Sequence, residues 1–153
     1  MTHFLNQAKL VNAAGAVQEP AAKILALYFA ADWCPDCRDF QPAFNDFYTK
    51  ANADGKQFEI VFVSSDANED DQLAHFRGKQ GPWLAVPFND PLRNDLKRKY
   101  QICAKKEMED VGVVDRVNGI PSVVIVAPNG DVLDGDGAPK IEADGIKALQ
   151  AWL

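Results

Sequence analysis

The stretch Ile24–Cys37, ILALYFAADWCPDC, decides the fold of this chain. Its first seven residues, 24–30, form an unbroken apolar run, which is typical of a strand covered by helices on both faces. Residues 34–51 predict a helix, so Cys34 lies at a helix N-terminus. Free backbone N–H groups and the helix dipole stabilise a thiolate there. Because two cysteines separated by two residues can form a disulfide or a dithiol, we expect Cys34 and Cys37 to perform thiol–disulfide exchange.

The rest of the chain predicts alternating strands and helices. An apolar stripe in the helix up to Ala51 faces a core, and Pro42 inside this helix should kink it. Asp90 is expected to cap a later helix. In chain order we predict an edge hairpin over 9–17, strands over 24–30 and 58–63, helices over 69–79 and 91–100, a strand over 122–127, a turn over 128–131, a strand over 132–133 and a helix over 142–153. Residues 102–118 are charged and irregular and receive no assignment.

This order predicts an α/β fold with a central mixed sheet and helices on both faces. The first half implies parallel strands with right-handed crossovers, and the second half adds an antiparallel hairpin and a closing helix. A chain of 153 residues is long enough to bury a core without further crosslinks. We therefore expect one domain over residues 1–153.

Composition excludes several classes of function. The net charge of −6 argues against binding to nucleic acid or to an anionic membrane surface. No apolar run reaches the roughly 18 residues of a membrane span, and Met1–Gly15 lacks the pattern of a signal peptide. Three cysteines, a close pair and the distant Cys103, fit a reducing compartment better than a disulfide framework. We expect a cytoplasmic monomer.

Three motifs carry a resemblance to a known family. Tyr28–Arg38, with Pro42 in the following helix, resembles the active-site segment of thioredoxin-fold proteins, and Gly119–Pro121 resembles the cis-proline loop of that fold. Residues 62–66, FVSSD, and 82–88, PWLAVPF, resemble motifs of the tryparedoxin and nucleoredoxin branch, in the same order along the chain. The resemblance covers about residue 10 to the C-terminus and implies the thioredoxin fold.

The sequence departs from that branch at two places. The branch usually carries two prolines between its cysteines, and Asp36 replaces the second one here. The sequence WCPDC instead resembles a small thioredoxin-related disulfide reductase of the eukaryotic cytosol. The stretch Cys103–Asn118 is longer than the usual link to the cis-proline loop. Both departures bear on the partner more than on the chemistry.

The positions of the two cysteines predict their roles. Cys34 is the candidate nucleophile, because it lies at the open end of the helix. Cys37, one helical turn further, faces the same side and would resolve the mixed disulfide. Trp33 would form an apolar wall beside the sulfur, and Pro35 would fix the backbone at the helix start.

The resemblance also implies a groove for the substrate. If Pro121 is cis, the backbone of Ile120 is exposed beside Cys34, where an extended substrate strand could pair with it. Trp83 and Pro87 would line the rim of the same groove. For Trp83 the alternative is an ordinary place in the core, since large aromatic residues are usually buried.

Asp36 has two opposing effects on the site. Its carboxylate in the first helical turn favours the helix dipole, but a negative charge near a thiolate disfavours the charged sulfur. We expect a reducing protein with a potential nearer about −270 mV than about −120 mV. Many thioredoxins carry a buried carboxylate under the active site. Tyr28 holds that position here, so water or another acid would have to serve as the base.

Metal sites compete with these interpretations. A zinc site needs about four ligands, and only Cys103, His3 and His75 could join the pair, none of them at ligand spacing. We expect no metal and no cofactor besides the redox-active Cys34–Cys37 disulfide. The sequence DGDG at 134–137 lacks the rest of a calcium-binding pattern and is expected to be a loop.

Other polar residues receive structural interpretations. His75 lies on a charged helix and is expected at the surface. Ser64–Asp66 is expected to be a strand end and helix cap rather than a catalytic unit. Cys103 is expected to be a small structural residue, with a regulatory thiol as the alternative.

The leading hypothesis is a disulfide reductase. It would pass electrons from a low-molecular-weight dithiol or a reductase to protein disulfides, with a peroxidase as one candidate partner. The alternative is a redox-sensitive protein-binding module of nucleoredoxin type with little turnover. An exported thioredoxin-like maturation protein is a third hypothesis, which the absent signal peptide disfavours.

Overall fold

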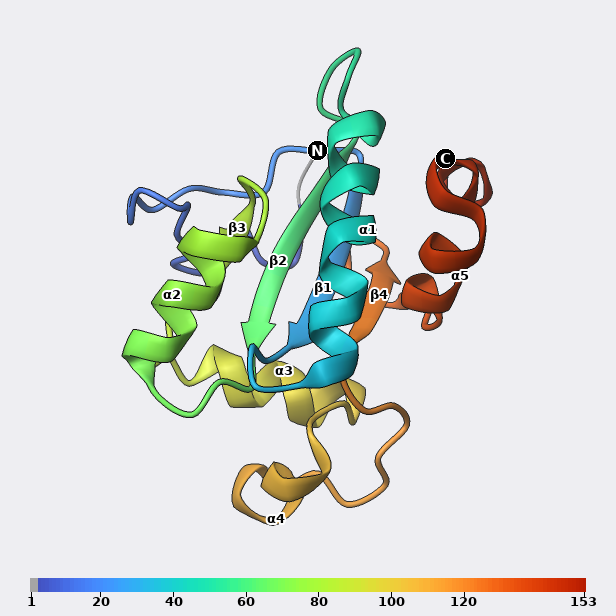
Figure 1. Ribbon diagram of the computed structural model, residues 1–153. Coiled ribbons are helices and arrows are strands. Elements are labelled where there is room, and N and C mark those ends of the chain that lie inside the picture. The colour runs from blue at the N-terminus through green and yellow to red at the C-terminus, as the bar shows by residue number, and fades with distance from the viewer. Residues whose placement is uncertain (1–2) are drawn as a thin grey trace.

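The computed structural model describes residues 3–153 and holds a five-stranded mixed sheet in the order β3-β2-β1-β4-β5. The predicted α/β fold is confirmed (Figure 1). Strand β1 lies at the centre, parallel to β2 and antiparallel to β4, while β3 and β5 form the two edges. The strands are β1 (Ile24–Ala30), β2 (Phe58–Ser64), β3 (Leu84–Ala85), β4 (Ser122–Val126) and β5 (Val132–Asp134). Residues 1–2 of the predicted domain lie outside the described part.

Helices cover both faces of the sheet. The helices are α1 (Pro35–Ala51), α2 (Glu69–Lys79), α3 (Leu92–Tyr100), α4 (Met108–Val111) and α5 (Gly137–Asp144), with 3₁₀ turns η1 (Lys105–Glu107) and η2 (Gly145–Ala151). Successive side chains of a strand point to opposite faces. Even-numbered residues of β1 accordingly pack with α1, α2 and α5, and odd-numbered ones pack with α3. All seven residues of β1 are buried, which explains its unbroken apolar sequence.

The prediction for the last helix is wrong in its bounds. Helix α5 begins at Gly137, five residues before the predicted start at 142, and it ends at Asp144. Pro139 is compatible with this early start, because the first turn of a helix leaves its N–H groups unpaired. Gly145 then adopts a φ of 57°, a conformation that side chains disfavour, and the chain continues as η2.

One short strand was not predicted, and one helix starts later than predicted. The strand β3 lies inside the PWLAVPF motif, and Val11 pairs with Ala85 as well as with Val17, so the edge hairpin is real. Helix α3 starts at Leu92, whose backbone N–H donates to the Asp90 carboxylate. This start lies one residue past the predicted one.

Residues 102–118, which received no assignment from the sequence, form an excursion beyond the carboxyl ends of β1 and β2, at the bottom of the view in Figure 1. It contains η1 and α4 and is closed by a bridge between Ile102 and Asn118. An ion pair between fully buried Lys97 and partly buried Glu107 anchors it: Lys97 Nζ lies 2.5 Å from Glu107 Oε1. Burial lowers the pKa of Lys97, and the Glu107 carboxylate opposes that shift.

Within residues 3–153, none of the helices combines the length and the apolar character that a membrane crossing requires.

Candidate active site

The two cysteines lie where β1 gives way to α1. Cys34 is the N-cap residue of α1, and its Sγ accepts the backbone N–H of Cys37 at 3.3 Å. Both are free thiols. Cys34 is 6% exposed and Cys37 only 1%, so the sulfur at the helix N-terminus is the one nearer solvent. Burial raises the pKa of the Cys37 thiol, and neighbouring Cys34 and the Asp36 carboxylate raise it further. Cys37 therefore stays protonated at neutral pH.

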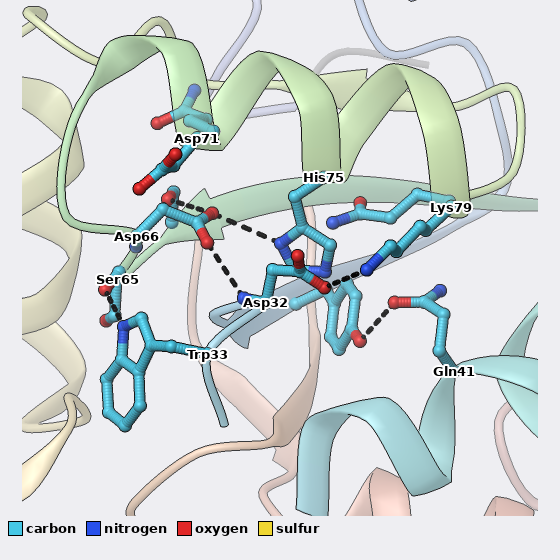
Figure 2. A network of polar contacts seen from close by, with 12 residues as sticks. Asp32, Trp33, Gln41, Ser65, Asp66, Asp71, His75 and Lys79 are labelled. Atoms are coloured by element: carbon cyan, nitrogen blue, oxygen red, sulfur yellow. Dashed lines mark hydrogen bonds and ion pairs between the residues drawn. The ribbon is translucent and has the colours of Figure 1, made fainter. Parts of the chain in front are cut away.

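Trp33 is fixed beside the sulfur. Its indole Nε1 donates to the Ser65 carbonyl at 2.8 Å, and the side chain is 38% exposed (Figure 2). The Lys106 ammonium lies 3.6 Å from the centre of its ring, within the range of a cation–π interaction. Trp33 and Cys34 line one hollow together with residues of the 102–118 excursion. Pro35 occupies the first position of α1 and Asp36 is exposed in its first turn.

The loop before β4, distant from the cysteines in sequence, lies beside them in the fold. The Ile120–Pro121 peptide bond is cis. The Ile120 carbonyl oxygen lies 3.9 Å from Cys34 Sγ, although the residues are 86 positions apart. Ile120 and Pro121 are both half-buried, and Ile120 lines the hollow that holds Cys34.

The prediction that Trp83 lines the rim is wrong. Trp83 is fully buried, with the rings of Tyr28, Phe44 and Tyr48 within 6.3 Å of its own. Its Nε1 donates to Gln80 Oε1 at 2.9 Å, so burial leaves no unpaired donor. Space around the ring is tight: a Cβ added at Gly81 would lie 2.5 Å from it. Pro87, the other predicted rim residue, is half-buried and does not line the hollow with Cys34.

A buried polar network lies directly behind the active-site loop (Figure 2). Asp66 Oδ1 accepts the backbone N–H of Asp32 at 2.8 Å, and Asp66 Oδ2 accepts the Ser64 hydroxyl at 2.7 Å. His75 Nδ1 lies 3.1 Å from the same Oδ2. Lys79 Nζ, one turn further along α2, pairs with the Asp32 carboxylate at 2.7 Å. These contacts tie the loop that carries Trp33 and Cys34 to β2 and α2.

Sequence reasoning missed this network twice. His75 was expected at the surface but is 3% exposed, with its ring edge-on to Phe62. Asp66 does not cap α2, because the Asn68 side chain accepts the Asp71 N–H at that N-terminus. The available signal was helical spacing: buried His75 and Phe76 stand three and four residues after buried Gln72.

Tyr28 takes the place of a buried carboxylate under the cysteines. Its hydroxyl donates to Gln41 Oε1 at 2.8 Å. Burial raises the pKa of Tyr28 well above its ordinary value, and Cys37, Cys34 and Asp66 add to the shift. Tyr28 is thus a neutral donor, held away from base chemistry by its own hydrogen bond.

Metal binding finds no support among the cysteines. Within residues 3–153, no three His, Cys, Asp or Glu side chains gather closely enough to hold a metal ion. Cys103 is fully buried against Val111 and Val113 in a small separate cluster. The segment 134–137 spans the end of β5 and the start of α5 rather than one loop.

Known proteins match both the sequence and the geometry. A family model described as thioredoxin-like matches residues 22–132. Human nucleoredoxin-like protein 1 is 31% identical over 135 residues, which cover 85% of this chain and 57% of that protein. Probable nucleoredoxin 2 of Oryza sativa subsp. japonica is 35% identical over 134 residues, covering 87% of this chain and 30% of that protein. The chain thus spans about half or less of these curated relatives.

Solved structures agree along almost the whole chain. Thioredoxin from Wuchereria bancrofti superposes with a TM-score of 0.77 and 32% identity, covering 99% of this chain and 97% of that one. Tryparedoxin II from C. fasciculata gives a TM-score of 0.71 and 29% identity, covering 92% and 84%. The sequence relatives and the structural neighbours thus include nucleoredoxins and tryparedoxins, respectively.

Proposed function

The chain belongs to the thioredoxin-like family, in its tryparedoxin and nucleoredoxin branch, and we propose that it reduces protein disulfides through Cys34 and Cys37. One observation carries the proposal. A free thiol at the N-cap of α1 stands 3.9 Å from the Ile120 carbonyl, with a second, buried thiol one helical turn behind it. That arrangement supplies a nucleophile, a place for a substrate strand and a resolving group.

The first step joins protein and substrate. The Cys34 thiolate attacks one sulfur of the substrate disulfide, and a Cys34–substrate disulfide forms as the substrate S–S bond breaks. The departing sulfur leaves as a thiolate and takes a proton from water. The N-terminus of α1 and the Cys37 N–H stabilise the attacking charge on Cys34.

The second step releases the substrate. Cys37 loses its proton to water, and its sulfur attacks Cys34 Sγ. A Cys34–Cys37 disulfide forms while the second substrate sulfur leaves as a thiolate and takes a proton from water. The substrate has gained two electrons and two protons. The protein has lost two electrons and its two thiol protons, the one from Cys34 having gone to water when its thiolate formed. A low-molecular-weight dithiol or a reductase would restore both thiols by the reverse exchange.

The proposed exchange chemistry suggests a compartment and a class of partner. We infer a reducing compartment such as the cytoplasm, because one close cysteine pair and the distant Cys103 fit redox exchange better than a structural disulfide framework. Substrates would be disulfide-containing proteins, with a peroxidase as one candidate. We further propose that the chain acts as a single domain and as a monomer, with no cofactor besides its own disulfide.

Insulin reduction driven by dithiothreitol tests the proposal. The wild-type protein should accelerate the reaction, and Cys34→Ser should abolish the acceleration. Cys103→Ala is the matched control, because it removes a thiol that lies outside the hollow, and it should keep the wild-type rate. A wild-type rate equal to that of Cys34→Ser rejects the reductase and favours a protein-binding module.

Trapping tests the separate roles of the cysteines. In Cys37→Ser the second step cannot occur, so the substrate should stay linked to Cys34 and be recovered as a mixed disulfide. Cys34→Ser should trap nothing. Recovery of a substrate on Cys37 in that variant would reverse the assigned roles.

A further inference from the structure

Two hollows of opposite charge meet at Gly119 and Ile120, and one of them holds the reactive sulfur. We define the cationic groove as the hollow that holds Cys34 and Ile120 and is lined by Lys105, Lys106 and Arg116. The acidic groove also reaches Ile120, and its charged lining consists of Asp36, Asp39 and Glu142. Neither groove is lined by a charged side chain of the opposite sign.

These six charges are free to bind a partner. In the described part of the chain, residues 3–153, none of them forms an ion pair within 4 Å. The nearest candidate acid for the cations, Glu107, is taken up by buried Lys97. Asp110 lines a neighbouring hollow that shares Trp33 and Lys106 with the cationic groove, but it forms no ion pair with any of the three cations.

The cationic groove is also held in shape. Lys106 lies over the Trp33 ring, and Arg116 Nη1 donates to the Cys103 carbonyl at 3.3 Å. The ion pair between buried Lys97 and Glu107 fixes η1, which carries Lys105 and Lys106. Positive charge beside Cys34 is therefore built into the 102–118 excursion, although the whole chain carries a net charge of −6.

We propose that the site selects disulfides by a charge pattern: the substrate strand carries an acidic side chain on one side of its half-cystine and a basic one on the other. The inference rests on the proposed function, and the occupant is an extended segment of a protein disulfide. Because Gly119 and Ile120 line both grooves, a strand that pairs beside Ile120 with its sulfur at Cys34 lies where the two grooves meet. Two residues of a strand span about 6.6 Å, so the charged side chains lie within two or three positions of the cysteine.

The charges of the two grooves would select the direction of the bound strand as well as its sequence. Because the two grooves differ in sign, a strand can satisfy both in one direction only. A peptide with its charges in the reverse order meets like charges at both ends, and peptides with the same charge on both sides gain at one groove what they lose at the other. Exposed ion pairs contribute about two- to fivefold each, and salt screens them.

The test uses five peptides that differ only at the two positions that share a strand face with the cysteine: Glu-Ala-Cys-Ala-Lys, Lys-Ala-Cys-Ala-Glu, Glu-Ala-Cys-Ala-Glu, Lys-Ala-Cys-Ala-Lys and Gln-Ala-Cys-Ala-Gln. Each cysteine is joined by a disulfide to 2-mercaptoethanol, so that the leaving group is neutral. We expect one of the two mixed-charge peptides to exceed the neutral one in kcat/KM by about fivefold or more, the other to fall below it, and salt to shrink the difference. Equal kcat/KM within twofold for all five overturns the inference.

Variants assign the effect to the cationic groove. Lys105→Gln with Lys106→Gln should lower the ratio of the favoured peptide to bis(2-hydroxyethyl) disulfide, a small neutral substrate. This ratio cancels any change in the reactivity of Cys34. Lys147→Gln, an exposed lysine outside both grooves, is the matched control and should keep the wild-type ratio. An unchanged ratio in the double variant contradicts the proposal.

The same measurements distinguish loss of the charge preference from loss of the reductase activity itself. If the wild-type protein reduces neither the peptides nor the small neutral disulfide, the proposed function itself is wrong. If it reduces all of them without regard to charge, the reductase stands and only the charge pattern is rejected.

Discussion

Two tryptophans, Trp33 and Trp83, occur in motifs of the same family resemblance and were both expected to wall the substrate groove. Trp33 is partly exposed, donates to Ser65 and lies under Lys106. Trp83 is wholly enclosed by aromatic rings beneath α1. The difference comes from position, because Trp33 stands on the loop between β1 and α1, whereas Trp83 directly precedes an edge strand that turns it inward. Burial thus assigns Trp83 to the core, whereas for Trp33 we propose a role in substrate recognition.

Trp83→Ala should have the largest effect. Removing a fully buried indole leaves a cavity among packed rings, so the free energy of unfolding should fall by about 3–5 kcal/mol. Denaturant unfolding measures the loss. Insulin reduction per folded molecule should stay at the wild-type level, since the ring does not reach the hollow with Cys34. A loss below about 1 kcal/mol would contradict the assignment of Trp83 to the core.

Asp66→Ala should cause the second-largest loss of stability, because it removes the central acceptor of the polar network that holds the loop of Trp33. The substitution leaves the Asp32 N–H and the Ser64 hydroxyl without their acceptor and removes the partner of His75. We expect a loss of about 2–4 kcal/mol in denaturant unfolding. Asp70→Ala, on the exposed face of α2, is the control and should change stability by under about 0.5 kcal/mol. Equal losses of stability in Asp66→Ala and Asp70→Ala would contradict a stabilising role of the network.

Trp33→Ala should affect activity more than stability, the opposite of Trp83→Ala. The free energy of unfolding should fall by only about 1 kcal/mol, since one hydrogen bond and one cation–π contact are lost. The kcat/KM for insulin should fall by about tenfold, because a wall of the groove disappears. Trp33→Phe keeps the ring over which Lys106 lies and should recover part of the rate. A stability loss as large as that of Trp83→Ala would make the two tryptophans equivalent.

Asp36→Asn should have the smallest effect. The Asp36 carboxylate contributes to the raised pKa of Cys37, so its removal lowers that pKa and increases the thiolate fraction at a given pH. The second exchange step should then accelerate by about twofold at pH 7, and its pH profile should move to lower pH. Stopped-flow release of substrate from the mixed disulfide measures this step. The control Asp54→Asn, in the turn beyond α1, should leave the pH profile unchanged. A shift of the Asp36→Asn profile to higher pH would contradict the prediction.

Local pattern accounts for what could be predicted. The bounds of β1 and α2 match the predicted 24–30 and 69–79, and β2 extends one residue past the predicted 58–63. Apolar runs and helical spacing set these elements within one short window of sequence. The thiol pair was found in the same way, because its spacing and its place behind a strand are local features.

Contacts between distant segments account for what was missed. His75 and Asp66 are polar, and only the fold shows that they satisfy each other and the Asp32 N–H, 34 residues from Asp66. Lys97 gives the same lesson, because its charge suggests solvent and its burial depends on Glu107 across the 102–118 excursion. Propensity within one segment carries no information on such partners.

Buried Cys103 offers a way to measure how often the 102–118 excursion, which bears the cationic groove, opens. Its sulfur is enclosed with Val111 and Val113, and burial raises the pKa of its thiol. A thiol reagent reaches it only when that segment detaches from α3. With Cys34 and Cys37 both changed to serine, Cys103 is the single thiol left, and its alkylation rate in native buffer reports how often the segment opens. The same rate, followed while a substrate peptide is added, would show whether an occupied groove holds the segment closed.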